Sequence, residues 1–311
     1  MNKLTKAGFA GLFLSLTAVL ASCGSSSETS SDTVAVTADV FPVTVGDLTL
    51  DAQPTRIISL SPTATEMLYA IGAGSQVVAV DEYSNYPAEA VALGTPLSGF
   101  EPNIEAISGY TPDLVIISYD PGSLVEQLST LDIPVFVAGA AMSIENVYEQ
   151  IEQLGVLTGN SQKAIEVSKT LQTGIEEAVA SVQFSEPPLS YYYELDNTYY
   201  SVTSNTFIGQ IFNLFGMRNI ADNVESGNDY PQLSAEVIVS ADPDFIFLAD
   251  TKCCAQSAET VAARDGWGGL QAVSLGSIVA LDDDIASRWG PRLVDLVRVV
   301  AEAVTSLLAK S

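Results

Sequence analysis

The 311-residue sequence contains no histidine. This absence excludes catalytic pairs in which an imidazole activates a serine or cysteine, and it excludes HExxH zinc sites and histidine-ligated haem. The segments SPTATE and SVTSNT offer serines and carboxylates, but without histidine they lack a competent base near neutral pH, so a hydrolase is disfavoured. We expect a protein that is not an enzyme and that has no resident cofactor or metal site.

Basic residues are scarce. The chain has 12 lysines and arginines against 38 aspartates and glutamates, which gives a formal charge of −26. A strongly negative field repels phosphate backbones and anionic lipid headgroups. Nucleic acid is therefore a poor partner, and we expect none. We also expect a monomer whose ligand is a small molecule.

Long apolar runs are also missing, apart from the 15-residue stretch AGFAGLFLSLTAVLA that follows the basic start MNKLTK. A membrane span needs about 20 apolar residues, so this run is more typical of a secretory signal. It ends in Leu-Ala-Ser-Cys, which resembles a bacterial lipobox, and we predict a signal peptide over residues 1–22 and a lipid on Cys23. An ordinary cleaved signal with an incidental cysteine is the alternative. Loss of the signal removes two lysines and leaves 10 basic against 38 acidic residues, a charge of −28.

The segment after Cys23, GSSSETSSD, is rich in serine and lacks aromatic residues, so residues 23–39 are predicted to form a flexible tether. Beyond it, apolar strands such as RIISL and LVIIS alternate with short helical patterns, which is typical of parallel sheets covered on both faces. Thr63 and Glu66 have the spacing of a capping box at the first of these helices.

The pattern changes once, at residues 161–182, where apolar residues recur every three or four positions and predict one long helix. A second series of strands, including LSYYYEL, YYSVT and FIFLA, follows it. We therefore predict an α/β fold with two Rossmann-like lobes, 40–156 and 187–311, whose mostly parallel sheets are joined by a connecting helix within 157–186. A ligand cleft should lie between the lobes, at the carboxyl ends of the strands, and a stiff helix should permit only small closure.

One unit occurs twice, as IEAISGYTPDLVIIS at 104–118 and as AEVIVSADPDFIFLA at 235–249. Each copy places a glutamate, Glu105 or Glu236, in the first turn of a predicted helix. Such glutamates complement the helix dipole, a contribution of about 0.3–1 kcal/mol. Two at matched positions also suggest one carboxylate on each lobe for a two-fold partner, and spacing alone leaves both interpretations open.

Several motifs occur in one order: the lipobox, PTRIISLSPTATEMLYAIGAG, DEYSNYP, the two repeats, GWGGLQAV and RWGPRLVD. Over nearly the whole chain after the tether, they resemble the solute-binding proteins of bacterial cobalamin and ferric-siderophore ABC importers. The resemblance implies an exported protein, lipid-anchored on the outer face of the cytoplasmic membrane. It also implies that Glu105 and Glu236 dock to arginines of a dimeric permease.

Segments after the strand ends should face the cleft, and they carry several aromatic residues that suit a large, flat ligand. About half of these are expected to be ordinary core or surface residues. The resemblance carries aromatic contacts onto Tyr83, Phe100 and Tyr230 and a polar contact onto Arg288. The full set of aromatic candidates is Tyr83, Tyr86, Phe100, Tyr199, Tyr230 and Trp289.

Only three cations fall in these segments: Lys252, Arg288 and Arg292. For Arg292, which precedes an apolar helix, an ion pair with Asp295 or a capping role is the alternative to a ligand contact. Catecholate siderophores are strongly anionic and usually need several arginines. A corrinoid with little net charge therefore suits this cleft better, while a hydroxamate siderophore complex or haem remains the alternative cargo.

The adjacent cysteines Cys253 and Cys254 are the remaining thiols if Cys23 carries a lipid. Exported proteins meet oxidising surroundings, so a vicinal disulfide at the cleft mouth is our hypothesis. A free buried pair, or a thiolate ligand for a metal or for corrin cobalt, are the alternatives.

Overall fold

The computed structural model describes residues 39–310, which belong to one compact unit spanning Thr37–Ser311. The predicted signal peptide, almost all of the tether and the lipidation site Cys23 lie outside the described residues. The described part begins with a hairpin of β1 (Val43–Val45) and β2 (Leu48–Leu50), which pair antiparallel. Gly46 in its turn has a φ of +57°, a conformation that favours glycine.

The first lobe is built on a parallel sheet in the order β4-β3-β5-β6. Alternate strand residues face opposite sides: Ile57 and Ile116 pack with the apolar residues of α1 and α5, whereas Ile58 and Val115 pack with those of α3 and α4. The predicted doubly covered parallel sheet is therefore confirmed. Its strands are β3 (Ile57–Leu60), β4 (Val77–Val80), β5 (Leu114–Ile117) and β6 (Val135–Val137), and its helices are α1 (Pro62–Ala70), α2 (Ala88–Val91), α3 (Ile104–Gly109), α4 (Leu124–Ser129) and α5 (Ile144–Thr158), with 3₁₀ turns at Gly74–Gln76 and Pro121–Ser123.

The second lobe repeats this topology in the order β10-β9-β7-β8, again fully parallel. In both sheets the first strand in sequence lies between the second and the third. The strands are β7 (Ser190–Glu194), β8 (Arg218–Asn219), β9 (Phe245–Leu248) and β10 (Ile278–Ala280), and the helices are α7 (Phe207–Asn213), α8 (Ala235–Ala241), α9 (Ala258–Ala262), α10 (Gln271–Ser274) and α11 (Asp283–Ser287), with a 3₁₀ turn at Trp267–Gly269. The strand expected from YYSVT is wrong, because Tyr200 forms only an isolated bridge with Gln232.

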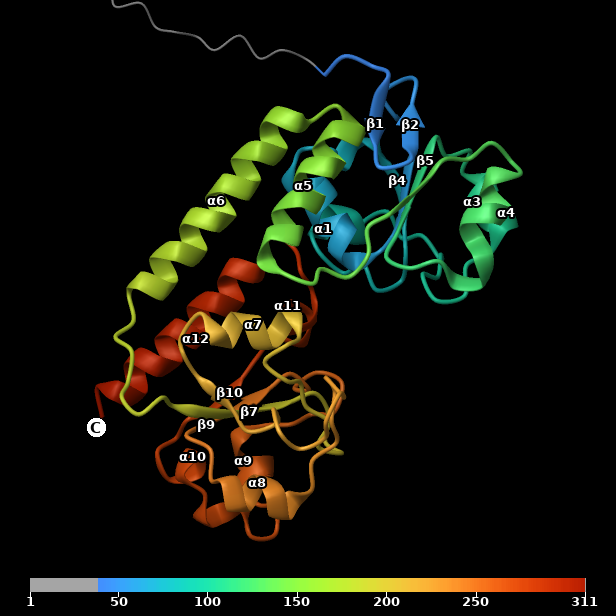
Figure 1. The fold of residues 1–311 in the computed structure, drawn as a ribbon. Coiled ribbons are helices and arrows are strands. Elements are labelled where there is room, and N and C mark those ends of the chain that lie inside the picture. The colour runs from blue at the N-terminus through green and yellow to red at the C-terminus, as the bar shows by residue number, and fades with distance from the viewer. Residues whose placement is uncertain (1–38, 311) are drawn as a thin grey trace, which may run out of the picture. The chain divides into compact units, whose positions relative to one another are not determined.

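The long helix α6 (Ser161–Ala180) connects the two series of strands and spans about 30 Å. It packs beside α5 and the C-terminal helix α12 (Leu293–Leu308), as Figure 1 shows. Gly155 on α5 allows this approach, since a Cβ there would lie 2.3 Å from the Ala164 Cβ on α6. One apolar cluster runs through these helices and includes Ile57 of the first sheet and Phe247 of the second. The lobes therefore share a core on their helical side.

The aspartate of each repeated Pro-Asp has the same structural role in both lobes. The Asp113 carboxylate accepts hydrogen bonds from the backbone N–H groups of Thr55 and Arg56, at 2.8 and 2.9 Å, just before β3. The Asp244 carboxylate accepts one from the backbone N–H of Ser190, at 2.7 Å, at the start of β7. Each aspartate thus fixes the start of the first strand of its sheet.

Candidate functional site

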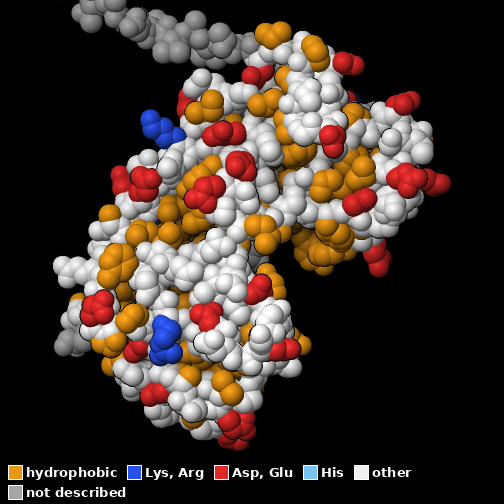
Figure 2. All heavy atoms as spheres, viewed as in Figure 1, with side chains coloured by type: hydrophobic (Ala, Val, Ile, Leu, Met, Phe, Trp, Pro, Cys, Tyr) orange, Lys and Arg blue, Asp and Glu red, His pale blue; other side chains and the backbone are white. Residues whose placement is uncertain are grey.

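The candidate site is a cavity of about 410 Å³ at the junction of the two lobes. Figure 2 shows hydrophobic side chains gathered on the first-lobe side of the hollow between the lobes, where no Lys or Arg among the described residues is seen. First-lobe residues from the carboxyl ends of β3, β4 and β5 line it, together with residues of the α11 segment from the second lobe. The lining comprises Leu60, Ser61, Pro62, Thr63, Asp81, Tyr83, Gly99, Phe100, Ser118, Tyr119, Asp284, Ser287, Arg288 and Trp289.

Three aromatic residues, Tyr83, Phe100 and Tyr119, form what we call the aromatic wall on the first-lobe side. Tyr83 and Phe100 meet edge to face with ring centroids 5.5 Å apart, and Phe100 and Tyr119 lie 6.2 Å apart. Their exposed fractions are 53%, 62% and 43% for Tyr83, Phe100 and Tyr119. Large aromatic surface left this open to solvent is available to a ligand.

Tyr119 was not predicted as a site residue. It follows β5 by two positions, so the rule that ligands bind beyond the carboxyl ends of parallel strands would have indicated it. Tyr83 and Phe100, which were predicted, do line the cavity.

A buried polar chain lies beneath the aromatic wall. Ser84 donates a short hydrogen bond to the Asp81 carboxylate, and Thr65 hydrogen-bonds the hydroxyls of Ser59 and Ser84, each at 2.9 Å. Burial raises the pKa of Asp81 above its usual value, partly offset by the Ser84 hydrogen bond. Gly99 lets its loop lie close to Leu60, since a Cβ at position 99 would be 2.8 Å from the Leu60 carbonyl oxygen.

Arg288 is the cavity's one cation among the lining residues, and the protein already uses its hydrogen bonds. Nη1 donates to Glu66 Oε1 at 2.9 Å and to Asn85 Oδ1 at 2.8 Å. Nη2 donates to the Tyr83 carbonyl at 3.0 Å and to Asp284 Oδ1 at 2.8 Å. These contacts account for all four Nη–H groups. Trp289, which also lines the cavity, donates its indole N–H to Gln150 Oε1 on α5 at 3.1 Å.

Lys252 and Tyr230 are not among the residues that line this cavity. The Lys252 ammonium pairs with Asp282 at 2.8 Å and with Asp284 at 2.6 Å, which holds it beside the α11 segment. Tyr230 is 54% exposed and lies in the stretch between β8 and α8. Their predicted ligand contacts therefore stay predictions.

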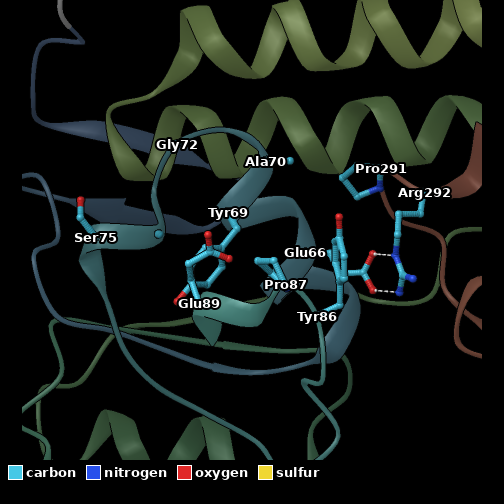
Figure 3. A pocket seen from close by; sticks show the side chains of 11 residues that line it. Glu66, Tyr69, Ala70, Gly72, Ser75, Tyr86, Pro87, Glu89, Pro291 and Arg292 are labelled. Atoms are coloured by element: carbon cyan, nitrogen blue, oxygen red, sulfur yellow. Dashed lines mark hydrogen bonds and ion pairs between the residues drawn. The ribbon is translucent and has the colours of Figure 1, made fainter. Parts of the chain in front are cut away.

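Arg292 does not pair with Asp295, as its position in sequence suggested. Its Nε and Nη2 donate to the two oxygens of Glu66, at 2.8 and 2.5 Å, and its guanidinium lies 4.3 Å from the ring centroid of Tyr86 (Figure 3). These groups line a second cavity, of about 830 Å³, beside the carboxyl end of α1. The predicted capping box is also wrong, because Ser61 caps α1 and Glu66 is a buried ion-pair partner.

Tyr199 was expected in the cleft but belongs to a packed cluster in the second lobe. Its ring stacks on Trp267 at 5.6 Å, and the Arg264 guanidinium lies over both rings. Arg264 makes two hydrogen bonds to the buried carboxylate of Glu194, at 2.7 and 2.6 Å. These contacts explain Tyr199 as a structural residue.

The repeated glutamates occupy equivalent positions. Glu105 and Glu236 are each the second residue of a helix, after the side-chain caps Asn103 and Ser234, and both are exposed. Hydrogen bonds from its own backbone N–H and from Ser234 lower the pKa of Glu236. Neither carboxylate forms an ion pair within residues 39–310.

Cys253 and Cys254 are free thiols in the structure, with Sγ atoms 2.6 Å apart. The backbone N–H of Cys253 donates to Asp283 and that of Cys254 to the Asp250 carbonyl, so the turn is well anchored. The disulfide stays a prediction. Among the described residues, no group of three or more Cys, Asp or Glu side chains is arranged to hold a metal ion.

Comparisons with known proteins identify the family. The model of the periplasmic binding protein family matches residues 57–285. The ABC transporter substrate-binding lipoprotein YvrC of Bacillus subtilis is 30% identical over 96% of this chain and 97% of its own length. A cobalamin-binding protein of Halobacterium salinarum is 33% identical over 85% of this chain and 74% of its own.

The fold of solved relatives agrees with this assignment. The periplasmic vitamin B12-binding protein BtuF of Vibrio cholerae superposes with a TM-score of 0.65 at 29% identity, over 82% of this chain and 97% of that one. No helix among residues 39–310 has the length and apolar character of a membrane span. The chain belongs to the periplasmic binding protein family, the extracytoplasmic substrate-binding proteins of ABC importers.

Proposed function

We propose that this protein captures a corrinoid, such as cobalamin, outside the membrane and delivers it to a dimeric ABC permease. The observation that carries the proposal is the cavity between the lobes, which combines an exposed aromatic wall with a single cation that is already bonded. Relatives named for cobalamin and vitamin B12 binding support it.

The charge of the cavity favours a cargo with little net charge. Its ionisable lining groups are Asp81, Asp284 and Arg288 with the tyrosines, and Arg288 is paired with Glu66 and Asp284. A tris-catecholate complex would have to displace those carboxylates to reach the guanidinium, in a protein that is strongly acidic. A corrin ring needs apolar contact and a few neutral hydrogen-bonding groups, which this lining offers.

Docking to the permease is assigned to Glu105 and Glu236, one from each lobe, and membrane attachment to a lipid on Cys23. An exposed carboxylate at the same position of two topologically equivalent lobes suits a partner with two-fold symmetry. Arginines are suitable partners, since guanidinium and carboxylate can form paired hydrogen bonds.

The cargo assignment is tested by quenching of intrinsic fluorescence with cyanocobalamin, haem, a ferric hydroxamate and a ferric catecholate. We expect micromolar or tighter binding of cyanocobalamin and no binding of the catecholate. Phe100→Ala should weaken binding about tenfold, from a loss of roughly 1–1.5 kcal/mol of aromatic contact. Phe184, in the turn after α6, is 61% exposed against 62% for Phe100, so Phe184→Ala is a matched control that should change little. Absence of any cobalamin binding would remove the corrinoid assignment.

The docking assignment is tested by uptake. Glu236→Lys, and the double variant with Glu105→Lys, should abolish transport without changing cargo affinity. Glu259 provides a close control: it lies in the first turn of α9, is exposed, and has its pKa lowered by the cap Ser257 much as Ser234 acts on Glu236. If Glu259→Lys reduces uptake as much as Glu236→Lys, the glutamates serve the helices and not a partner.

A further inference from the structure

One buried carboxylate links the two lobes. Glu66, on α1 of the first lobe, is 3% exposed, and its Oε1 accepts hydrogen bonds from both Arg288 and Arg292, at 2.9 and 2.5 Å. Both arginines lie in the segment between α11 and α12, more than 220 residues along the chain. Figure 3 shows the side chains of Glu66 and Arg292 facing each other in the lining of the second cavity.

Glu66 and the two arginines depend on one another to compensate their buried charges. A buried carboxylate that loses its partners remains as an uncompensated charge, and so does a guanidinium that loses its acceptor. Arg288 and Arg292 have side chains that are only 9% and 19% exposed, so water replaces little of what either would lose.

Arg288 carries this link to the aromatic wall. Besides Glu66 it holds the carbonyl of Tyr83 and the side chain of Asn85, and Asn85 in turn donates to Asp284 Oδ2 at 3.2 Å. The loop that presents Tyr83 to the cavity is therefore fixed to the second lobe by the Arg288 guanidinium, together with the Asn85–Asp284 hydrogen bond.

We propose that Glu66, Arg288 and Arg292 form an inter-lobe tether, and that Arg288 is a positioning residue that sets the width of the cavity and the place of Tyr83. It is not a contact for the cargo. The part that concerns cargo rests on the proposed function, whereas the part that concerns the lobes does not.

Arg292 separates the two roles. It binds the same carboxylate as Arg288 but lines the second cavity and not the one with the aromatic wall, so we expect it to make no direct contact with a cargo held against that wall. If the tether positions the site, Arg292→Gln, Arg288→Gln and Glu66→Gln should each weaken cyanocobalamin binding by a similar factor, about tenfold. The double variant of Glu66 and Arg288 should be no worse than either single one, because both remove the same link.

A direct contact gives a different pattern. Arg288→Gln would then weaken binding, whereas Glu66→Gln, which releases the guanidinium toward the cavity, would leave binding unchanged or strengthen it. Arg292→Gln would have no effect. That pattern overturns the proposal. Asp295→Asn breaks an exposed pair with Arg298, at 3.4 Å, and serves as the control that should not change binding.

Hydrogen exchange of the cargo-free protein tests the tether independently of any ligand. The peptide that contains residues 82–90 should exchange faster in Glu66→Gln and Arg292→Gln than in the wild type or in Asp295→Asn. Arg292→Lys, which keeps the charge, should restore part of the protection and guards against a folding defect. Unchanged exchange in Glu66→Gln refutes the tether. If the wild type does not bind cobalamin, the proposed function is refuted, and the exchange data still test the tether.

Discussion

The buried carboxyl group of Asp250 makes the free energy of unfolding depend on pH. It follows β9, is fully buried, and neither of its carboxylate oxygens has a hydrogen-bond partner among the described residues. The side chains that act on it are the carboxylate of Glu194 and the Arg264 guanidinium. Because Arg264 is bound to Glu194, Asp250 shares a buried site with another carboxylate and has no cation of its own. A proton on Asp250 would let it donate to Glu194.

Burial, followed by the charge of Glu194, raises the pKa of Asp250 from 3.8 to about 7. Between about pH 4 and pH 7, the folded protein therefore keeps the Asp250 carboxyl protonated, whereas the unfolded chain has lost that proton. The resulting stabilisation is complete below about pH 4, decreases as the pH rises, and is lost above about pH 7. Between pH 5 and pH 8 the loss amounts to about 2.7 kcal/mol, at 1.36 kcal/mol for each pH unit below 7.

The assay is urea unfolding of the wild type and of Asp250→Asn at pH 5, 6, 7 and 8, with reductant present. Asparagine stays neutral, so the unfolding free energy of the wild type relative to the variant should fall by about 2.7 kcal/mol across this range. Other carboxyl groups contribute to both proteins and cancel in the difference. Asp295→Asn should follow the wild type, since Asp295 is exposed. Parallel curves for the wild type and Asp250→Asn would refute the buried proton.

Two further predictions concern packing and the cysteines. Gly155→Ala should lower the unfolding free energy by about 1–3 kcal/mol, because its Cβ would overlap Ala164 on α6. Gly109→Ala, on a helix with nothing within 4 Å of the new Cβ, should instead be neutral or stabilising by up to about 1 kcal/mol, as thermal unfolding can show. Intact mass after alkylation should show that Cys253 and Cys254 react only after reduction. Two free thiols in the untreated exported protein would contradict the vicinal disulfide.

The strands and many helices could be predicted because their signals are local. RIISL and LVIIS are apolar runs of strand length, and Asn103 and Ser234 cap helices as their side chains suggest. Helix α5 was missed although Ile144, Val147, Ile151 and Leu154 have helical spacing. The YYSVT run has strand composition, yet Tyr199 adopts a φ of +71° and stacks on Trp267, so tertiary packing decides its backbone.

The partners of buried charges could not be predicted in the same way. Sequence offers Arg292 a carboxylate three positions away, whereas the fold supplies Glu66 at a separation of 226 residues. Asp295 pairs with Arg298 instead. Contacts between residues so far apart in sequence depend on how the two lobes pack together, and no local sequence pattern predicts that. Arg288 could accordingly be placed at the cavity but not recognised as already bonded.

The structure distinguishes the role of the repeated aspartates from that of the repeated glutamates. Asp113 and Asp244 each fix the start of the first strand of a sheet, so the fold gives both aspartates a structural role. Glu105 and Glu236 do not fix a strand, and neither forms an ion pair within residues 39–310; each lies exposed on a helix whose cap is a different residue. A contribution to the helix dipole is small and is met equally well by an acidic residue elsewhere in the first turn. The fold thus accounts for the repeated aspartates, whereas the paired glutamates are the half of the signature that the proposed docking to a permease would explain.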